Sequence, residues 1–220
     1  MIEEITLKHL LPKVFEGMEN SSRIMHSQIW EEDSFSFKKN CRICVVAESG
    51  GGKSSLLSFI YGIRQDYIGN IFFNKGNIRN LNIKEWCDIR INHIALLPQD
   101  MQLFPQLTSF QNIQLKNNLT NYKTEKEIEI LMHKLGILEK KNDLVGKMSV
   151  GQQQRVAFIR TLCQPFDFIF LDEPVSHLDE ENNKIMATIV EEEADSKNAG
   201  IISTSVGNHL MLSNPEYIRL

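Results

Sequence analysis

A glycine-rich segment between an apolar stretch and an apolar helical pattern has the residue types of a phosphate-binding loop. The segment runs from Ala47 to Ser55 and follows the stretch Ile43–Val46, so a strand, a loop and a helix are expected in that order. The glycines allow close backbone approach to an oxyanion, the N–H groups supply positive potential, Lys53 reaches the β- and γ-phosphates, and Ser54 can ligate Mg²⁺. The residues predicted to bind the phosphates are Ser49, Gly50, Gly51, Gly52, Lys53, Ser54 and Ser55.

Two adjacent carboxylates form the second candidate site. Asp172 and Glu173 directly follow the apolar run Phe168–Leu171. A strand that ends in two acids delivers both to the carboxyl edge of a parallel sheet, where ligands bind. There Asp172 would hold Mg²⁺, and Glu173 would orient or deprotonate an attacking water. Taken alone, paired acids after a strand are often a solvated loop, but their combination with a phosphate loop favours the catalytic interpretation.

The elements that must position these residues are indicated by short apolar runs that alternate with longer amphipathic stretches. This alternation is typical of strands joined by crossover helices and predicts an α/β fold. The predicted strands are Ile5–Leu7, Phe35–Phe37, Ile43–Val46, Ile71–Phe73, His93–Leu97, Phe168–Leu171 and Ile201–Thr204. The strands that begin at Ile43, Phe168 and Ile201 are apolar throughout and are expected at the centre of the sheet.

The region over residues 99–165 shows helical rather than strand signals. Thr124 and Glu127 form a capping-box pattern that opens an apolar helical periodicity. We interpret this region as a helical subdomain inserted into the α/β core. The chain is then one domain, whose core comprises residues 1–98 and 166–220.

Composition and charge exclude several classes of protein. The 220 residues include 24 lysines and arginines and 28 aspartates and glutamates, a formal net charge of −4. Nucleic-acid binders need an electropositive footprint that this chain lacks, so no nucleic-acid partner is expected. The longest apolar runs are far shorter than the roughly 20 residues that span a bilayer, and the acidic start does not fit a signal peptide. We expect a cytoplasmic protein that contacts a membrane only through a partner.

Three further segments carry a resemblance to one family. Met148–Arg155 (Met-Ser-Val-Gly-Gln-Gln-Gln-Arg) resembles the Leu-Ser-Gly-Gly-Gln-Gln-Gln-Arg signature of ATP-binding cassette (ABC) ATPases. Pro98-Gln99 resembles their Q-loop, and Ser176–Asp179 resembles their D-loop. The resemblance covers nearly the whole chain and is closest to bacterial ATP-binding subunits of ABC transporters. It implies a P-loop NTPase fold with a mostly parallel central sheet, an antiparallel β edge and the inserted helical subdomain.

The resemblance also implies roles for individual residues. ABC domains form a head-to-tail homodimer or pseudo-dimer, in which two ATP molecules lie between the phosphate loop of one subunit and the signature of the other. The signature residues implied to act in trans are Ser149, Val150, Gly151 and Gln152. The implied catalytic positions are Glu173, Gln99 and Ser205, and the implied Mg²⁺ ligands are Ser54, Gln99 and Asp172. Asp179 would bridge the subunits, and Phe15 would stack on the adenine.

Several positions depart from the family pattern. Ala47 stands where the phosphate loop has its first glycine, and a methyl group is tolerated there if the backbone φ is not strongly positive. Val150 replaces the first signature glycine. Ser205 follows Thr204 where the family carries a switch histidine, and His209 lies four residues further on. We expect the contact of that histidine with the γ-phosphate to be lost or bridged by water, unless His209 folds back.

Two assignments have alternatives. Because the segment between residues 17 and 28 is longer than usual, Trp30 competes with Phe15 as the aromatic residue that stacks on adenine. The segment Met101–Thr108 resembles the part of an ABC domain that seats a coupling helix of the membrane subunit, although Leu103 and Phe104 could equally belong to the subdomain core.

Three functions are compatible with these motifs, and the motifs favour one of them over the other two. The leading hypothesis is the ATP-hydrolysing subunit of a transporter, in which ATP-driven dimerisation is coupled to translocation by a membrane protein. A nucleotide-gated scaffold with weak hydrolysis is the alternative, motivated by Ala47, Val150 and Ser205. A non-transport ABC ATPase is disfavoured because the chain has neither a long coiled coil nor a second cassette. The transported substrate and its direction depend on the membrane partner.

Overall fold

A parallel sheet forms the centre of the molecule, seen in a computed structural model that describes residues 1–18, 24 and 26–220. Its strand order is β6-β7-β8-β3-β9, and every neighbouring pair is parallel. The strands are β3 (Arg42–Val46), β6 (Ile94–Leu97), β7 (Phe168–Asp172), β8 (Gly200–Ser205) and β9 (Glu216–Arg219). The three strands predicted to be central are confirmed as the inner strands β7, β8 and β3.

A smaller antiparallel sheet lies beside the parallel one. Its order is β2-β1-β4-β5, and each predicted strand of this part is confirmed. The strands are β1 (Glu4–Pro12), β2 (Ser34–Lys38), β4 (Tyr67–Phe73) and β5 (Gly76–Asn77). The 3-10 helix η1 (Lys13–Phe15) directly follows β1 and brings Phe15 towards the phosphate loop.

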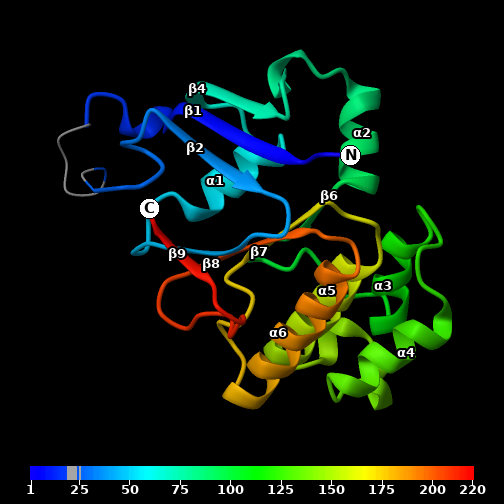
Figure 1. Ribbon diagram of the computed structural model, residues 1–220. Coiled ribbons are helices and arrows are strands. Elements are labelled where there is room, and N and C mark those ends of the chain that lie inside the picture. Colours follow the sequence, from blue (N-terminus) through cyan, green and yellow to red (C-terminus); the bar gives the residue numbers. More distant parts are fainter. Residues whose placement is uncertain (19–23, 25) are drawn as a thin grey trace.

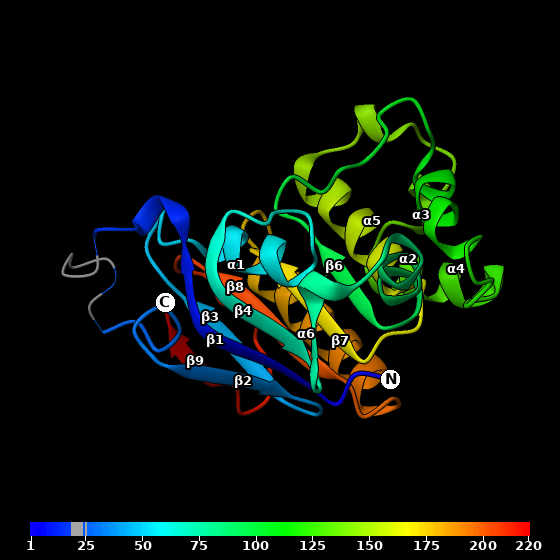
Figure 2. The same cartoon turned by 90° about the horizontal axis from the view of Figure 1, so that it is seen from above.

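Helix α1 (Lys53–Ile60) lies between the two sheets, as Figures 1 and 2 show. Leu56 and Phe59 of this helix are fully buried in a core that also contains Ile5 of β1 and Val45 of β3. Because both sheets contribute to this core, burial of apolar surface fixes the position of α1. The start of α1 is thereby held at the carboxyl edge of the parallel sheet.

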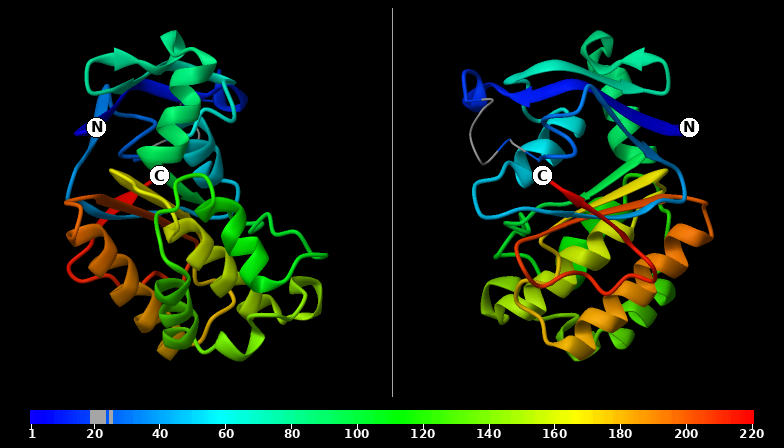
Figure 3. Two further views of the ribbon diagram at one scale, coloured as in Figure 1. Left: turned by 90° about the vertical axis from the view of Figure 1, so that its right-hand side faces the viewer. Right: turned by 60° about the vertical axis from the view of Figure 1, so that its left-hand side comes forward.

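The opposite face of the parallel sheet is covered by helices (Figure 3). The helices on this face are α3 (Ser109–Asn117), α4 (Glu125–Lys134), α5 (Val150–Leu162) and α6 (Glu180–Asp195), with the 3-10 helices η3 (Leu138–Lys140) and η4 (Val145–Lys147). Helix α2 (Ile83–Asn92) and the 3-10 helix η2 (Ile78–Asn80) pack instead against the core that contains α1. The capping box predicted at Thr124 is confirmed at the start of α4. Residues 99–165 contain α3, α4 and α5, packed on a core shared with α6.

The predicted fold class is confirmed: a mostly parallel sheet, an antiparallel sheet at its edge and a helical part. No helix among the described residues is long and apolar enough to cross a bilayer. Strand β9 was not predicted, because only Ile218 of its four residues is buried and its sequence is otherwise polar. Such a short edge strand gives little signal in the sequence.

Candidate nucleotide-binding site

The glycine loop connects β3 to α1, in the order that the sequence predicts. Gly52 precedes α1 with a φ of 96°, a left-handed conformation that favours glycine. A Cβ atom on Gly51 would lie 2.8 Å from the Cβ of Ala47, so the chain folds back closely here. Ala47 itself has no positive φ, which confirms the condition under which its methyl group is tolerated.

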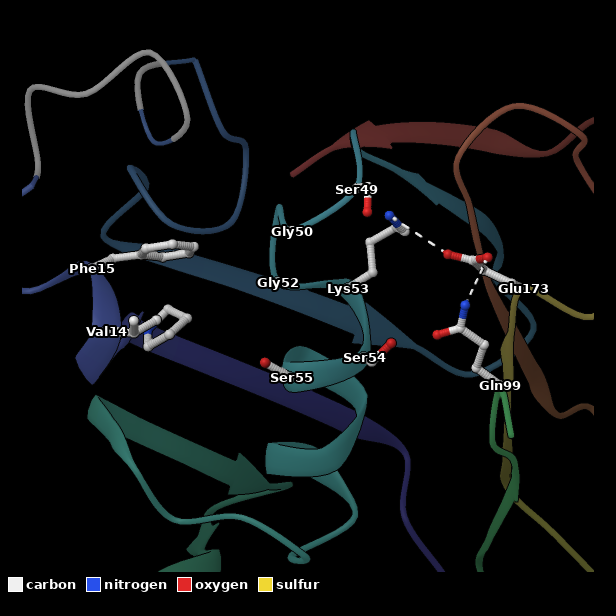
Figure 4. A pocket seen from close by; sticks show the side chains of 11 residues that line it. Val14, Phe15, Ser49, Gly50, Gly52, Lys53, Ser54, Ser55, Gln99 and Glu173 are labelled. Carbon is white, nitrogen blue, oxygen red and sulfur yellow. Dashed lines mark hydrogen bonds and ion pairs between the residues drawn. The ribbon is translucent and has the colours of Figure 1, made fainter. Parts of the chain in front are cut away.

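A cavity of about 340 Å³ opens in front of this loop (Figure 4). Its lining comes from the end of β1, η1, the loop and first turn of α1, and the ends of β6 and β7. The lining residues are Pro12, Val14, Phe15, Ser49, Gly50, Gly52, Lys53, Ser54, Ser55, Gln99 and Glu173. Residues predicted from four separate motifs therefore surround one cavity, whereas Gly51, Asp172 and Ser205 do not line it.

Lys53 and Glu173 approach each other at one end of this cavity (Figure 4). Lys53 is buried, and its Nζ donates to the carbonyls of Ala47 at 3.0 Å and Glu48 at 3.1 Å. The same Nζ lies 3.8 Å from Glu173 Oε1, and Gln99 Nε2 donates to Glu173 Oε2 at 3.1 Å. The ammonium group of Lys53 and the carboxylate of Glu173 therefore lie together where the glycine loop and the ends of β6 and β7 meet. This arrangement is expected of a site that binds anions and activates water.

Asp172 is held just behind the cavity by a residue that sequence reasoning missed. Asp172 is buried, and its Oδ1 accepts a hydrogen bond from Thr204 Oγ1 at 2.6 Å. The same hydroxyl oxygen accepts from the backbone N–H of Glu173 at 3.1 Å. Asp172 and Thr204 are paired in register on β7 and β8. The sequence signal that could have indicated this contact is a polar residue, Thr204, near the end of a second central strand.

The two aromatic candidates occupy different positions. Phe15 lines the cavity from η1, next to Val14, which is 69% exposed. Trp30 is buried, its Nε1 donates to the carbonyl of Gly51 at 3.2 Å, and its ring lies 3.2 Å from the position of a Cβ on Gly52. Trp30 therefore supports the loop and does not line the cavity. Residues 19–23 and 25 of the preceding long segment lie outside the described residues.

His209 forms a bond with Ser205 and does not reach into the cavity. Ser205 is buried at the end of β8, and its Oγ forms a hydrogen bond with His209 Nδ1. Cys44 Sγ lies 3.8 Å from Ser205 Oγ and 3.7 Å from His209 Nδ1, and burial raises the pKa of this thiol. The backbone N–H of Ala47 donates to the carbonyl of Ser205 at 3.4 Å. Ser205 therefore adjoins the first residue of the phosphate loop, although neither Ser205 nor His209 lines the cavity.

The signature segment begins helix α5 on the surface. Ser149 and Gln152 form a capping box, in which Ser149 Oγ accepts from Gln152 N at 3.3 Å and Gln152 Oε1 accepts from Ser149 N at 3.0 Å. Ser149 is exposed, and so is Val150, at 47%. A Cβ on Gly151 would lie 3.1 Å from the carbonyl of His177, in the D-loop segment. None of these residues lines the chain's own cavity.

Asp179 lies at the start of α6, at the end of the D-loop segment. Its carboxylate accepts hydrogen bonds from the backbone and side chain of Asn182, and these bonds hold its pKa below the usual range. Asp179 is exposed. The signature and D-loop residues therefore adjoin one another on the surface, where a second molecule could reach them.

Comparisons with known proteins agree with this geometry. The family model for the ABC transporter matches residues 30–176. The ABC transporter ATP-binding protein YtrE of Bacillus subtilis (strain 168) is 28% identical over 195 residues, which cover 87% of this chain and 82% of YtrE. The ergothioneine transport ATP-binding protein EgtV of Helicobacter pylori (strain G27) is 32% identical over 169 residues, which cover 74% of this chain and 76% of EgtV.

A comparison with solved structures gives an ABC cassette as well. The dimeric structure of MJ0796, a bacterial ABC transporter cassette, matches with a TM-score of 0.76 over 98% of this chain and 94% of that chain, at 19% identity. A likeness at that identity shows the fold, and the family follows from the sequence matches. The resemblance drawn from the motifs is thus confirmed, and the chain belongs to the ABC transporter family as one of its ATP-binding subunits.

Proposed function

We propose that this protein hydrolyses Mg-ATP between two subunits and thereby drives a membrane transporter. The observation that carries the proposal is the cavity in which Lys53, Gln99 and Glu173 meet at one end and Phe15 lies at the other (Figure 4). ATP fits this arrangement with its phosphates on the glycine loop and its adenine at Phe15. The loop amides and the N-terminus of α1 would stabilise the phosphate charge.

The donor atoms at the loop fit a magnesium ion that arrives with the nucleotide. Among the described residues, no group of three or more His, Cys, Asp or Glu side chains could hold a metal ion by itself. Mg²⁺ is usually held by one or two protein oxygens together with substrate phosphates, and Ser54 and Gln99 offer such oxygens in the cavity. Asp172 does not line the cavity and would act on the shell of the ion from behind it. When bound, the ion would neutralise charge on the phosphates during transfer.

The chain's own residues would carry the remaining steps. Lys53 would exchange its bonds to the carbonyls of Ala47 and Glu48 for phosphate oxygens, which are stronger acceptors. Glu173 would then be released from Lys53 and would orient or deprotonate the attacking water. Gln99, which donates to the same carboxylate, would keep it pointed at the site.

A second copy of the chain would complete the site. Ser149, Val150, Gly151 and Gln152 lie outside the chain's own cavity, and a head-to-tail arrangement would bring the partner's signature onto the γ-phosphate. The N-terminus of α5 would add a favourable dipole there. Asp179, exposed beside the signature, would contact the other subunit.

A groove beside the Q-loop would receive the membrane partner. It has a volume of about 340 Å³, and its rim includes Ile63, Phe104 and Leu115, which are 57%, 54% and 45% exposed. The neighbouring Leu103 packs against the subdomain core. In this segment, Leu103 therefore belongs to the core, whereas the exposed Phe104 is available for docking. Exposed apolar side chains around a groove are typical of docking sites. Docking here would place the protein on the cytoplasmic face of a membrane.

The bond between Ser205 and His209 favours one alternative, a nucleotide-gated subunit with weak hydrolysis. Both side chains engage each other outside the cavity, so neither is placed to contact a γ-phosphate. In that case ATP binding and dimerisation would be preserved while turnover would be slow.

The test of the proposed function is the variant Glu173→Gln. Glutamine keeps the size of the side chain but removes the base, so steady-state ATPase activity should be abolished while the ATP-bound dimer accumulates. Gel filtration with light scattering in the presence of Mg-ATP measures that dimer, and EDTA should dissolve it. Unchanged turnover in Glu173→Gln would remove Glu173 from the mechanism. A wild type that dimerises with ATP without releasing phosphate would identify the alternative.

A further inference from the structure

The backbone of Glu173 has an unusual conformation. Its φ is 49°, in the left-handed region that residues with a side chain rarely adopt. Such a conformation persists only where the surroundings hold it, and it is concentrated at functional sites. The contacts that hold it therefore decide where the Glu173 carboxylate points.

Side chains from two other elements hold the main chain of Glu173. On one side, its N–H donates to Thr204 Oγ1 of β8 at 3.1 Å. On the other side, its carbonyl accepts from Gln154 Nε2 of α5 at 3.2 Å. The carbonyl also accepts from the N–H of Ser176 at 3.4 Å, within the turn that follows. Gln154 is thus the tertiary contact that fixes the carbonyl.

The surroundings of Gln154 indicate that its amide serves this contact. Gln154 is only 4% exposed, and because a carbonyl can only accept, the nitrogen of the amide must face Glu173. The same nitrogen lies 3.4 Å from Ser176 Oγ. Gln154 Oε1 is then buried without a hydrogen-bond partner among the described residues. Buried polar atoms are normally paired, so a residue selected for stability alone would not be expected to leave this one unpaired.

We propose that Gln154 is a positioning residue for hydrolysis. By holding the carbonyl of Glu173, it fixes the left-handed backbone and aims the carboxylate at Gln99 and the cavity, where the water would be activated. Gln154 does not line the cavity, and the hydrogen bonds of its side chain go to Glu173 and Ser176, not to the phosphate loop or Lys53. The inference rests on the proposed function, because it assigns Gln154 its role through Glu173.

The experiment compares Gln154→Met with a matched control, Gln164→Met. Gln164 is 1% exposed, and its Nε2 also donates to carbonyls, those of Arg90, Ile94 and Pro165. Both substitutions keep the length of the side chain and remove a buried amide. A misplacement of about 1 Å at a reacting group can cost roughly 100-fold in rate, so kcat should fall between about tenfold and 100-fold in Gln154→Met. ATP affinity should stay unchanged, and the control should keep both values.

Two further variants make the result decisive. Gln154→Glu keeps the shape but presents an acceptor to the Glu173 carbonyl, so it should also lose kcat; it replaces Gln154→Met if the latter fails to fold. In the Glu173→Gln background, where hydrolysis is already abolished, Gln154→Met should leave the accumulation of the ATP-bound dimer unchanged, because Gln154 acts on the hydrolytic step alone.

The outcomes separate the inference from the function on which it rests. If Glu173→Gln hydrolyses ATP at the wild-type rate, the proposed function fails. If Glu173→Gln is inactive while Gln154→Met and Gln154→Glu keep kcat, the inference about Gln154 is wrong. An equal loss in Gln164→Met, or a loss of ATP affinity that accounts for the whole effect, would show that Gln154 serves only the fold and would likewise overturn it.

Discussion

At the scale of single residues, hydrogen bonds and an ion pair between polar groups hold the side chains of the site in place. A buried ammonium group is costly unless it is hydrogen-bonded, and Lys53 finds the carbonyls of Ala47 and Glu48 and the carboxylate of Glu173. Phosphate oxygens can replace these acceptors without leaving the ammonium group unpaired. On the proposed function, binding a nucleotide would therefore exchange the partners of Lys53 and would free Glu173 to activate water.

Ser205 carries the first prediction at this scale. A serine hydroxyl is shorter than an imidazole and already bonds His209, so it supplies no direct donor to a γ-phosphate. Loss of one positioned donor to a transition state with developing negative charge commonly costs about 100- to 1000-fold in rate. We expect slow hydrolysis with ordinary ATP affinity in the wild type, and faster hydrolysis with unchanged affinity in Ser205→His. Phosphate release and calorimetry measure the two quantities separately.

His209→Ala tests the other possibility, that the histidine has moved along the chain. Collapse of activity in this variant, at unchanged affinity, would show that the switch histidine has moved to position 209. If wild-type turnover is already fast and neither Ser205→His nor His209→Ala alters it, this position has no part in hydrolysis.

At the scale of elements, η1 and the segment before β2 place two aromatic residues differently around the loop. Base stacking on an aromatic residue is worth about 1 to 3 kcal/mol. If Phe15 supplies this platform, Phe15→Ala should weaken ATP and ADP alike by roughly tenfold or more. Trp30→Ala removes a support of the loop and should chiefly lower thermal stability. Calorimetric titration with both nucleotides decides, and a larger affinity loss in Trp30→Ala would reverse the assignment.

Helix α3 carries a lysine whose burial has a consequence for stability. Desolvation in the groove, with a smaller contribution from Arg160, lowers the pKa of Lys116 from 10.5 to about 8. Below pH 8 the folded protein must hold this charge, so the free energy of unfolding should rise as pH increases from 8 towards 10.5. At pH 7, Lys116→Met should therefore stabilise the fold by about 1 to 2 kcal/mol after screening in the open groove.

Urea denaturation at pH 7 and pH 10 measures this effect. The gain in Lys116→Met should shrink at the higher pH, because the wild-type lysine is then neutral. Lys126→Met, an exposed position on α4, is the control and should show little change at either pH. A destabilised Lys116→Met at pH 7 would mean that the bond from Lys116 Nζ to the carbonyl of Arg90 outweighs the desolvation.

The elements also show what local patterns can and cannot predict. The central strands and the glycine loop were predictable because apolar runs and glycine spacing are local signals. Strand β9 could not be predicted, because a strand at the exposed edge of a sheet needs few apolar residues. The contacts of Thr204 and Gln154 with Glu173 escaped prediction for another reason. They join residues from three separate elements, and which side chains meet there is decided by the packing of α5 and β8 around β7.

At the scale of the whole molecule, the residues proposed to act on one ATP are divided between two surfaces. The cavity with Lys53 and Glu173 is one, and the exposed start of α5 at Ser149 is the other. Neither surface is sufficient alone in a head-to-tail dimer, whose two sites each need one surface from each chain. This division allows the arrangement to be tested without a structure of the complex.

The prediction concerns mixtures of inactive variants. Lys53→Ala should lose phosphate binding, and Ser149→Phe should block the signature, so each homodimer should be inactive. In a mixed dimer, the phosphate loop of the Ser149→Phe chain faces the intact signature of the Lys53→Ala chain, which gives one complete site. An equal mixture should therefore recover ATPase activity, up to roughly a quarter of the wild-type rate if the sites act independently.

The control mixes Lys53→Ala with Glu173→Gln. Both of these residues line the same cavity, so every dimer in this mixture has a defect in each of its sites and should stay inactive. Recovery in the first mixture and none in the second would establish that the signature acts in trans. If the first mixture remains inactive although light scattering shows mixed dimers with Mg-ATP, the exposed start of α5 does not serve the partner's nucleotide. The site would then have to be completed within one chain, by movement of the helices α3 to α5 towards the phosphate loop.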